Sequence, residues 1–207
     1  MESPKDTKTR LLEAAEQLFA QQGAEKTTLR QICAVADANL AAVNYHFGSK
    51  SELISATLSR MISLVVEAQM THLDALEQRV GATLPELEDV LRCYLAPIFD
   101  TSRNHPNLIV LFDNLSKAYG DIDRFHSRVM DLLEVVHRRY VALLHRALPH
   151  LGRAQLLYRY AFFWAGVHDI VDHWLRKDLQ SLFAVELDLS EAMQEEMVRF
   201  MAAGFRG

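Results

Sequence analysis

The sequence predicts an all-α protein in which a three-helix N-terminal domain with a helix-turn-helix precedes a larger helical domain. Apolar residues recur at helical spacing in every long segment, and half of the 207 residues are hydrophobic, which is enough to build a core. No stretch shows the regular alternation of apolar and polar residues that is typical of a strand. We place the two domains at residues 1–52 and 53–207.

The predicted N-terminal domain begins with a helix from about residue 6 to residue 22. Leu11, Ala15 and Leu18 line one face of this helix, and Gly23 ends it. We expect this helix to support the two short helices that follow.

The next two helices have the spacing of a helix-turn-helix. The sequence TLRQ at 28–31 fits a capping box, and the turn at 37–39 contains Asp and Asn, which tolerate left-handed backbone. The second helix is expected at Leu40–Phe47, with Val43 on its buried side. Such a unit lays its second helix in the major groove of DNA. The alternative is an ordinary helical pair inside an all-helical core.

The side of this unit that we expect to be exposed suits DNA. Its amide, hydroxyl and basic side chains can bind base edges or phosphates, and Ala41 and Ala42 can contact thymine methyl groups. The candidate DNA-binding residues are Thr27, Thr28, Arg30, Asn39, Leu40, Ala41, Ala42, Asn44, Tyr45, His46 and Lys50.

Charge supports DNA binding only locally. The net charge of the chain is −5, and residues 1–60 hold as many basic as acidic residues. The segment 26–50 contains three basic residues, Lys26, Arg30 and Lys50, and one acidic residue, Asp37. The basic footprint is therefore small, and helix N-termini and backbone amides must supply part of the phosphate binding.

The N-terminus and the cysteines indicate a cytoplasmic protein. The polar stretch MESPKDTKTR lacks an apolar signal segment, and no apolar run reaches the roughly 18 residues of a membrane span. Cys33 and Cys93 lie far apart in helical patterns, which indicates buried, reduced thiols. We expect no contact with a membrane.

The larger domain is predicted to be helical throughout. A fourth helix starts at Ser49 and meets no breaker before Gly81, and Pro97 should kink the helix that follows. The further helices are expected near 85–103, 107–119, 123–148, 153–178 and 190–205.

The segment 153–178 carries two apolar seams, so it needs two packing surfaces. One seam can face its own protomer and the other a partner, or the whole helix can be buried inside one chain. The first seam consists of Leu156, Tyr160, Phe163, Val167, Ile170 and Trp174, and the second of Leu157, Ala161, Trp164, Val171 and Leu175.

Two stretches of this chain resemble the N-terminal domain of TetR-family transcriptional regulators. They are LLEAAEQLFAQQGAEKTTLRQICAVADA and NYHFGSKSEL, and the resemblance covers about Thr9 to Arg60. The stretch NLAAVNYHFGSK is similar to a subgroup that includes fatty-acid-responsive repressors. Asp37 replaces the Gly of many members, so the turn should persist with slight strain. Leu40 and Ala41 also depart from the polar or small residues common there, so base specificity cannot be transferred from a relative.

The resemblance implies a homodimeric repressor that binds a palindromic operator and is released by a small apolar effector, such as a fatty acid or acyl-CoA. It implies no cofactor and no enzyme activity. The implied dimer-interface residues lie on the last two long helices: Tyr160, Phe163, Val167, Ile170, Trp174, Met197, Phe200 and Met201. Candidate ligand-binding residues, each of which can instead belong to the core, are Leu95, Phe99, Leu108, Phe112, Val136, Tyr140, Trp164 and His168.

Three rival hypotheses stay open. His168, Asp169, Asp172 and His173 form the pattern H-D-x-x-D-H, whose i, i+4 pairs can hold a metal for a small helical hydrolase. The simpler interpretation places these residues at the rim of a pocket or interface, and we expect no metal site. The second hypothesis is a lipid carrier without DNA function, and the third is a transcriptional activator of the same fold. The scattered histidines, His137 among them, are expected to be solvated or capping residues.

Overall fold

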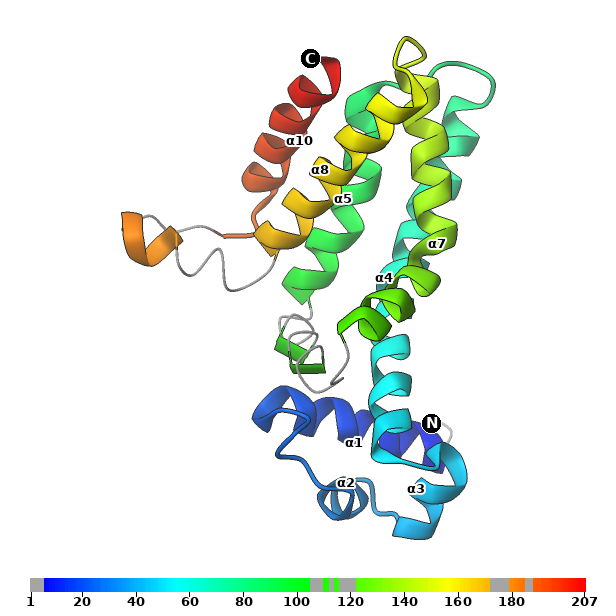
Figure 1. Cartoon of the computed structure of the whole chain (residues 1–207), viewed down its shortest axis with the longest axis vertical. Coiled ribbons are helices and arrows are strands. Elements are labelled where there is room, and N and C mark those ends of the chain that lie inside the picture. The colour runs from blue at the N-terminus through cyan, green and yellow to red at the C-terminus, as the bar shows by residue number, and fades with distance from the viewer. Residues whose placement is uncertain (1–5, 105–109, 112–113, 116–121, 172–178, 185–187) are drawn as a thin grey trace. The chain divides into compact units, whose positions relative to one another are not determined.

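The structure is a computed structural model that describes residues 6–104, 110–111, 114–115, 122–171, 179–184 and 188–207, without the side chains of 122–126 and 168–171. Within these ranges the chain is helical and forms no strand, so the predicted all-α fold is confirmed (Figure 1). The labelled helices are α1 (Thr7–Gln22), α2 (Leu29–Val35), α3 (Leu40–Phe47), α4 (Lys50–Val80), α5 (Leu87–Asn104), α7 (Ile122–Ala147), α8 (Arg153–Val171) and α10 (Glu191–Arg206).

The helix boundaries agree with the breakers in the sequence to within a few residues. Asp6 caps α1 by accepting a hydrogen bond from the Thr9 N–H at 2.7 Å, and Gly23 ends the helix with a φ of +83°. Helix α5 continues through Pro97 to Asn104. Most of the predicted helix at 107–119 and the last part of the one at 153–178 lie outside the described residues.

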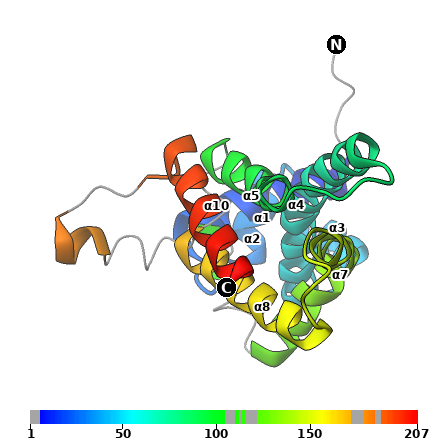
Figure 2. The same ribbon diagram turned by 90° about the horizontal axis from the view of Figure 1, so that it is seen from above.

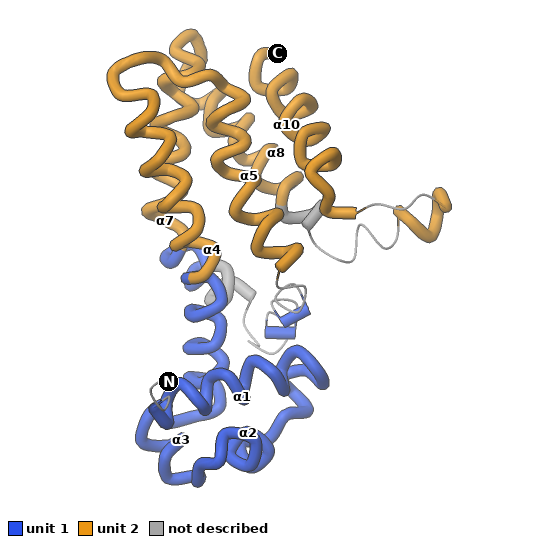
Figure 3. Tube along the Cα trace, turned by 180° about the vertical axis from the view of Figure 1, so that it is seen from behind, with its two compact units in different colours: residues 1–63, 107–132 blue, residues 64–106, 133–207 orange. Residues whose placement is uncertain are grey.

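The chain forms two compact units, each built from two stretches of sequence (Figure 3). The first unit contains residues 1–63 and 107–132, and the second contains 64–106 and 133–207. The chain changes unit three times: within α4, between residues 106 and 107, and within α7. The first unit thus includes a stretch that lies far beyond residue 52, where we placed the domain boundary.

The core of the first unit is formed where α1, α2 and α3 pack against one another. Each helix contributes fully or almost fully buried apolar residues, as the spacing in the sequence requires. They are Leu11, Ala15 and Phe19 of α1, Ile32 and Cys33 of α2, and Val43 and Phe47 of α3, together with Leu53 and Leu58 of α4.

The stretch 107–132 is tied to this unit by side-chain hydrogen bonds. The Asn114 amide donates to the carbonyl oxygen of Phe19 at 3.0 Å, and Arg128 donates to the Ser59 hydroxyl at 3.1 Å. Leu115 is fully buried. The C-terminal end of α1 is therefore held by residues that come almost a hundred positions later in the chain.

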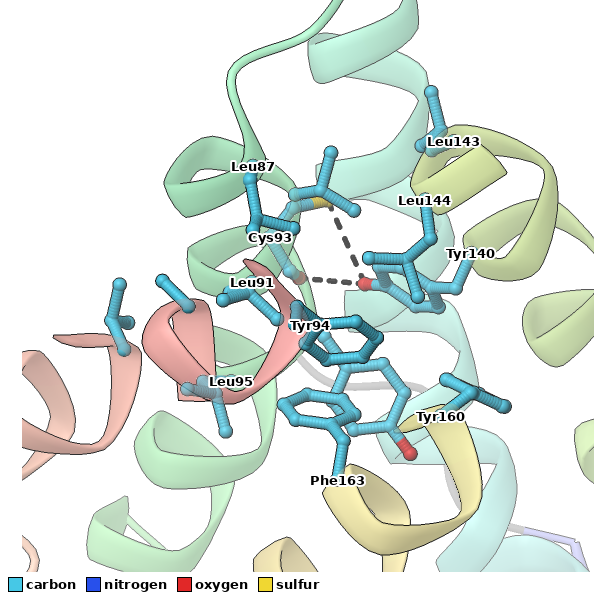
Figure 4. Packing of buried hydrophobic residues seen from close by; sticks show 14 of the residues in the cluster. Leu87, Leu91, Cys93, Tyr94, Leu95, Tyr140, Leu143, Leu144, Tyr160 and Phe163 are labelled. Atoms are coloured by element: carbon cyan, nitrogen blue, oxygen red, sulfur yellow. Dashed lines mark hydrogen bonds between the residues drawn. The ribbon is translucent and has the colours of Figure 1, made fainter. Parts of the chain in front are cut away.

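The core of the second unit surrounds α5, which contacts both α8 and α10 (Figures 1 and 2). Figure 4 shows its aromatic centre, where the ring of Tyr94 lies 4.7 Å from that of Tyr140 and 5.0 Å from that of Phe163. The Tyr140 hydroxyl donates to the Cys93 carbonyl oxygen at 2.6 Å. Burial raises the pKa of the Cys93 thiol to about 11, so this cysteine stays a protonated thiol, as predicted.

Polar links join the helices of the second unit at its surface. Arg139 on α7 donates to Asp74 at 2.7 Å and to Glu77 at 2.8 Å, both on α4. Arg92 on α5 binds both carboxylate oxygens of Glu195 on α10. Such partly exposed pairs add little stability, on the order of 1 kcal/mol or less each, but they define which helix faces meet.

Helix α4 has the length and average hydropathy of a membrane span, and it is the one such helix among the described residues. Length and composition alone indicate little, because core helices of soluble proteins have the same properties. In this structure, Leu53, Leu58 and Leu73 of α4 are fully buried against other helices of the protein.

Candidate nucleic-acid interface

The α2–turn–α3 unit is held by capping bonds at both of its helix starts. At α2, the Gln31 N–H donates to the Thr28 hydroxyl at 3.2 Å, and the Thr28 N–H donates to the Gln31 side-chain oxygen at 2.7 Å. At α3, the Ala42 N–H donates to the side-chain oxygen of Asn39 at 2.9 Å. The predicted capping box and the predicted bounds of the second helix are confirmed.

The turn between the helices uses left-handed backbone at Asp37, whose φ is +47°. The Ala38 N–H closes the turn by donating to the Cys33 carbonyl oxygen at 2.9 Å. A residue with a Cβ atom in this region costs about 1 kcal/mol or more, and Asp is among the residues that tolerate it best. The expected slight strain at Asp37 is therefore present.

Helix α3 has one buried and one exposed face. Val43 and Phe47 are buried against the core of the first unit, as predicted. The exposed face carries Leu40, Ala41, Asn44 and Tyr45, and Tyr45 is 86% exposed. Arg30 on α2 is also exposed. This short helix therefore offers a continuous free surface of the width that a DNA groove accepts.

Two further candidate DNA-binding residues, besides the capping residues Thr28 and Asn39, bind other parts of the protein with their side chains. Lys50, at the start of α4, donates from Nζ to the Glu25 carbonyl oxygen at 3.2 Å, which holds the loop before α2. Thr27 is fully buried, and its hydroxyl donates to the Gly23 carbonyl oxygen at 2.8 Å. Because its side chain is inside the unit, Thr27 supports the loop and does not belong to the exposed surface.

The remaining candidates lie at the surface. The Thr28 hydroxyl is used by the capping box, although the residue itself is exposed. His46 is half-buried, and its ring lies 5.0 Å from the ring of Tyr45 in an edge-on contact. Ala42 is also half-buried, at the border between the two faces of α3.

The described residues of the first seam of α8 lie inside the second unit, and this changes the surface that we assign to a partner. Tyr160, Phe163 and Val167 are 8%, 2% and 0% exposed, so they pack against the other helices of their own chain. Met197 of α10 is buried as well. These four residues cannot meet a partner without repacking the core. The side chains of Ile170 and Trp174 lie outside the described residues.

The surface of α8 and α10 instead exposes a different set of apolar residues. Tyr158 and Phe162 of α8 are 68% and 76% exposed, and Phe200 of α10 is 72% exposed. Leu157 is partly exposed on the same helix. Met201 is half-buried, and its side chain lies against Gly166, where an added Cβ would come within 2.9 Å of it. We call Tyr158, Phe162 and Phe200 the α8/α10 patch.

The candidate ligand-binding residues that the structure describes belong to the hydrophobic core. Leu95, Phe99, Val136 and Tyr140 are all buried there, and the half-buried Trp164 packs against the same cluster. Leu108, Phe112 and the side chain of His168 lie outside the described residues. The described positions therefore form the centre of the helical body, where an effector would have to displace existing contacts.

His137 was expected to be a solvated or capping residue, but it lies in the middle of α7 and is partly buried. The residue is half-buried where α7 meets α8, and its Nδ1 atom forms a 2.5 Å hydrogen bond with the Tyr160 hydroxyl. The ring also makes an edge-on contact with Trp164. Burial lowers the pKa of His137, so the imidazole is neutral near pH 7. Helical spacing did not indicate this, because a polar residue beside an apolar stripe usually faces solvent.

The H-D-x-x-D-H pattern falls on residues whose side chains the structure does not describe. Among the side chains that it does describe, no group of three His, Cys, Asp or Glu residues could hold a metal ion.

These features define a helix-turn-helix protein whose second helix presents an exposed face. Two models of one protein family match most of the chain. Residues 11–57 match the bacterial regulatory proteins of the tetR family, and residues 92–204 match the tetracyclin repressor-like C-terminal domain. The chain belongs to the TetR family of transcriptional regulators. The family consists of DNA-binding regulators and not enzymes, so the hydrolase hypothesis is not favoured.

The similar curated proteins are regulators of the same type. The transcriptional repressor NicS of Pseudomonas putida is 26% identical over 74% of this chain and 66% of its own length. The transcriptional dual regulator CecR of Shigella flexneri is 30% identical over 70% of this chain and 62% of its own length. The chain thus matches slightly less than two thirds of the length of each of these relatives.

Solved structures with low sequence identity share the fold. A TetR-like transcriptional regulator from Rhodococcus sp. RHA1 has a TM-score of 0.67 at 18% identity, with the whole of both chains covered. The fatty acid degradation regulator FadR from Bacillus halodurans has a TM-score of 0.65 at 15% identity, with 99% of each chain covered. At this identity the likeness concerns the fold alone.

Proposed function

We propose that this protein is a cytoplasmic, homodimeric repressor that binds a palindromic operator through α3 and leaves it when a small apolar effector binds the second unit. The observation that carries the proposal is the free face of α3, with Asn44 and Tyr45 exposed opposite the buried Val43. No described residue of the first unit covers this face, and helix-turn-helix proteins insert the corresponding face into the major groove.

In this proposal one exposed residue contacts a DNA base and the others contact backbone phosphates. Asn44 is exposed on the free face and reads a base edge, because an amide can pair with adenine in the major groove. Tyr45, Arg30 and Lys50 bind phosphates, and such contacts position the helix without reading sequence. The Lys50 ammonium keeps two donors for a phosphate after its bond to the Glu25 carbonyl oxygen.

DNA binding is tested by measuring affinity as a function of salt. The probe is the duplex that the protein selects from a random pool, with binding followed by fluorescence anisotropy. Lys50→Ala should weaken binding to every duplex and reduce the slope of log affinity against log salt by about one. Arg153→Ala, at an exposed position on α8 in the second unit, is the matched control and should leave the slope unchanged. An unchanged slope for Lys50→Ala would contradict the docking.

The α8/α10 patch supports the homodimer. Large apolar side chains that stand exposed on neighbouring helices mark surfaces that another protein covers. A second copy of the chain suits the palindromic operator, because a two-fold protein matches a two-fold site. The residues of the first seam of α8 are used within the protomer, so the patch, and not that seam, is the surface that we assign to the partner.

The effector is proposed to act through α4, which, like α7, has residues in both units. A ligand releases DNA only if it binds the non-binding state more tightly than the binding state. The similarity of the α3 segment to fatty-acid-responsive repressors favours an acyl chain, and the apolar core around Phe99 and Trp164 suits such a ligand. FadR of Bacillus halodurans, which is named for fatty acid degradation, supports this choice by fold only.

The effector is tested by titrating the protein–operator complex with fatty acids and acyl-CoA thioesters of several chain lengths. One length range should release the operator. Trp164→Ala should change effector affinity more than effector-free DNA affinity. If no acyl chain shifts binding, the acyl assignment fails while the DNA-binding proposal stands. Equal loss of effector-free DNA binding in Trp164→Ala would mark Trp164 as an ordinary core residue.

Activation is the second candidate, because CecR is named as a dual regulator. The two functions differ in the position of the operator relative to the promoter, which the protein itself does not determine. Deleting the gene and measuring transcripts of the neighbouring genes separates them. Transcripts rise if the protein represses these genes and fall if it activates them.

A further inference from the structure

The polar side chains at the two helix starts of the α2–α3 unit are used for capping. The side-chain oxygen of Asn39 accepts the Ala42 N–H at 2.9 Å. The Thr28 hydroxyl accepts the Gln31 N–H and donates to the Gln31 side-chain oxygen at 3.0 Å. These groups hold the local fold, so they contribute less to the reading of DNA bases than their positions in the sequence suggest.

The exposed side chains at the start of α3 are apolar. Leu40 is 44% exposed, and the neighbouring Ala41 is exposed as well. Neither side chain has a donor or an acceptor, so neither can hydrogen-bond to a base. They nevertheless occupy the first turn of the recognition helix, and in helix-turn-helix proteins that turn contacts base edges.

One group on the major-groove edges of the bases is apolar, the C5-methyl of thymine. We propose that Leu40, with Ala41 beside it, makes this protein select thymine by packing against its methyl group. This inference rests on the proposed insertion of α3 into the major groove. Asn44 stands one helical turn after Leu40 on the same exposed face and supplies the hydrogen bonds to a neighbouring base.

The two contacts together give a pattern for each half of the operator. Leu40 selects a thymine by its methyl group, and Asn44 selects an adenine by its N6 and N7 atoms. A cytosine methylated at C5 carries the same apolar group in the groove, so its methyl should substitute for that of thymine. The half-site then contains a T and an A within a few base pairs of each other.

The experiment removes the methyl group without changing base pairing. The duplex selected from a random pool is resynthesised with deoxyuridine in place of thymidine, one position at a time, and affinities are measured by anisotropy. At one or two positions in each half-site, deoxyuridine should weaken binding about fourfold, which corresponds to one buried methyl group. Deoxyuridine at every remaining position should have no effect.

Protein variants assign the methyl contact to its residue. Leu40→Ala should bind the thymidine and deoxyuridine duplexes with nearly equal affinity at the sensitive position. Tyr45→Phe, which changes an exposed residue on the same helix, should keep the full fourfold difference. The ratio of the two affinities is the readout, so a general loss of binding in a variant does not disturb the comparison.

The outcomes separate this inference from the proposed function. If no duplex is selected from the pool, the DNA-binding proposal itself fails. If a duplex is selected but deoxyuridine has no effect at any position, the protein binds DNA and the thymine inference is wrong. If the sensitivity persists in Leu40→Ala, another residue reads the methyl group, and the assignment to Leu40 is overturned.

Discussion

Individual residues of the first unit divide into those that hold the helices and those that face solvent. The side-chain oxygens of Thr27 and Asn39 form hydrogen bonds within the unit, at the loop before α2 and at the start of α3, although Asn39 itself is exposed. Asn44 and Tyr45 lie on the exposed face of α3, away from the core of the unit. Changes in the first group should therefore alter stability, and changes in the second should alter DNA binding.

The backbone at Asp37 gives a stability prediction. Its φ of +47° favours glycine, so Asp37→Gly should keep or slightly raise stability, by up to about 1 kcal/mol. Asp37→Val should lower it by about 1–2 kcal/mol, because a β-branched side chain is strained in this region. Thermal unfolding followed by circular dichroism ranks the three proteins. Equal melting temperatures for the Gly and Val variants would contradict the strained turn.

His137 predicts a dependence of stability on pH. Burial lowers the pKa of His137 in the folded protein, while an unfolded histidine titrates near about 6.5. As the pH falls through that value, the unfolded state binds the proton first, so the free energy of unfolding decreases. The loss is complete once the pH is below the folded pKa.

Urea unfolding at pH 7.5 and pH 5.5 tests this, with His137→Gln as the control. An amide can still hydrogen-bond to the Tyr160 hydroxyl, and it does not titrate. The wild-type protein should lose more stability than the variant between the two pH values, because the other histidines are common to both. Equal losses would show that His137 carries no share of the pH dependence.

At the scale of helices, spacing predicted where the described helices lie, but it did not predict which seam of α8 is buried within its own chain. The breakers and caps defined α1, α2 and α3, whose bounds depend on neighbouring residues alone. The two seams of α8 indicated two packing surfaces. The pattern did not indicate which seam packs within the protomer and which is free to meet a partner. Which seam turns inward depends on contacts with α5 and α10, and these form only in the folded chain.

The two faces of α8 should respond differently to charge. Phe162→Glu places a carboxylate on the α8/α10 patch, so it should leave the fold intact and convert the proposed dimer to a monomer. Val167→Glu places an unpaired charge at a fully buried position and should destabilise the protomer by roughly 3 kcal/mol or more.

Light scattering and thermal unfolding of the two variants separate these effects. Arg153→Glu, at an exposed position on α8 outside the patch, is the control and should remain dimeric. A stable dimer for Phe162→Glu would show that the patch does not hold the partner. A folded Val167→Glu protein with wild-type stability would contradict the burial of the first seam.

For the whole molecule, the division into two units depends on contacts between distant parts of the chain, which a single sequence does not reveal. The residues of 107–132 carry no pattern that joins them to α1. Their place follows from Asn114, whose amide donates to the Phe19 carbonyl oxygen, and this oxygen also accepts the Gly23 N–H at 3.0 Å. Two donors thus meet at the end of α1.

Removing one donor gives a prediction for the first unit. Asn114→Ala should cost about 1 kcal/mol, because the lost hydrogen bond is partly buried. Hydrogen exchange of the Gly23 amide should become faster, since the end of α1 is less restrained. Asn104→Ala, an exposed position at the end of α5, should leave this exchange unchanged. Unaltered exchange in Asn114→Ala would show that Asn114 does not restrain α1.

The bond from Asn114 also determines how DNA-binding specificity could be exchanged between relatives. A chimera joined at a single point after α3 would take its operator preference from one parent and the support for α1 from the other. Leu115 and Asn114 would then meet an α1 helix that comes from the other parent. A graft that transfers residues 1–63 together with 107–132 keeps both sides of this contact from the same parent. The DNA-binding unit of this regulator therefore consists of two segments of chain, and a graft must transfer both.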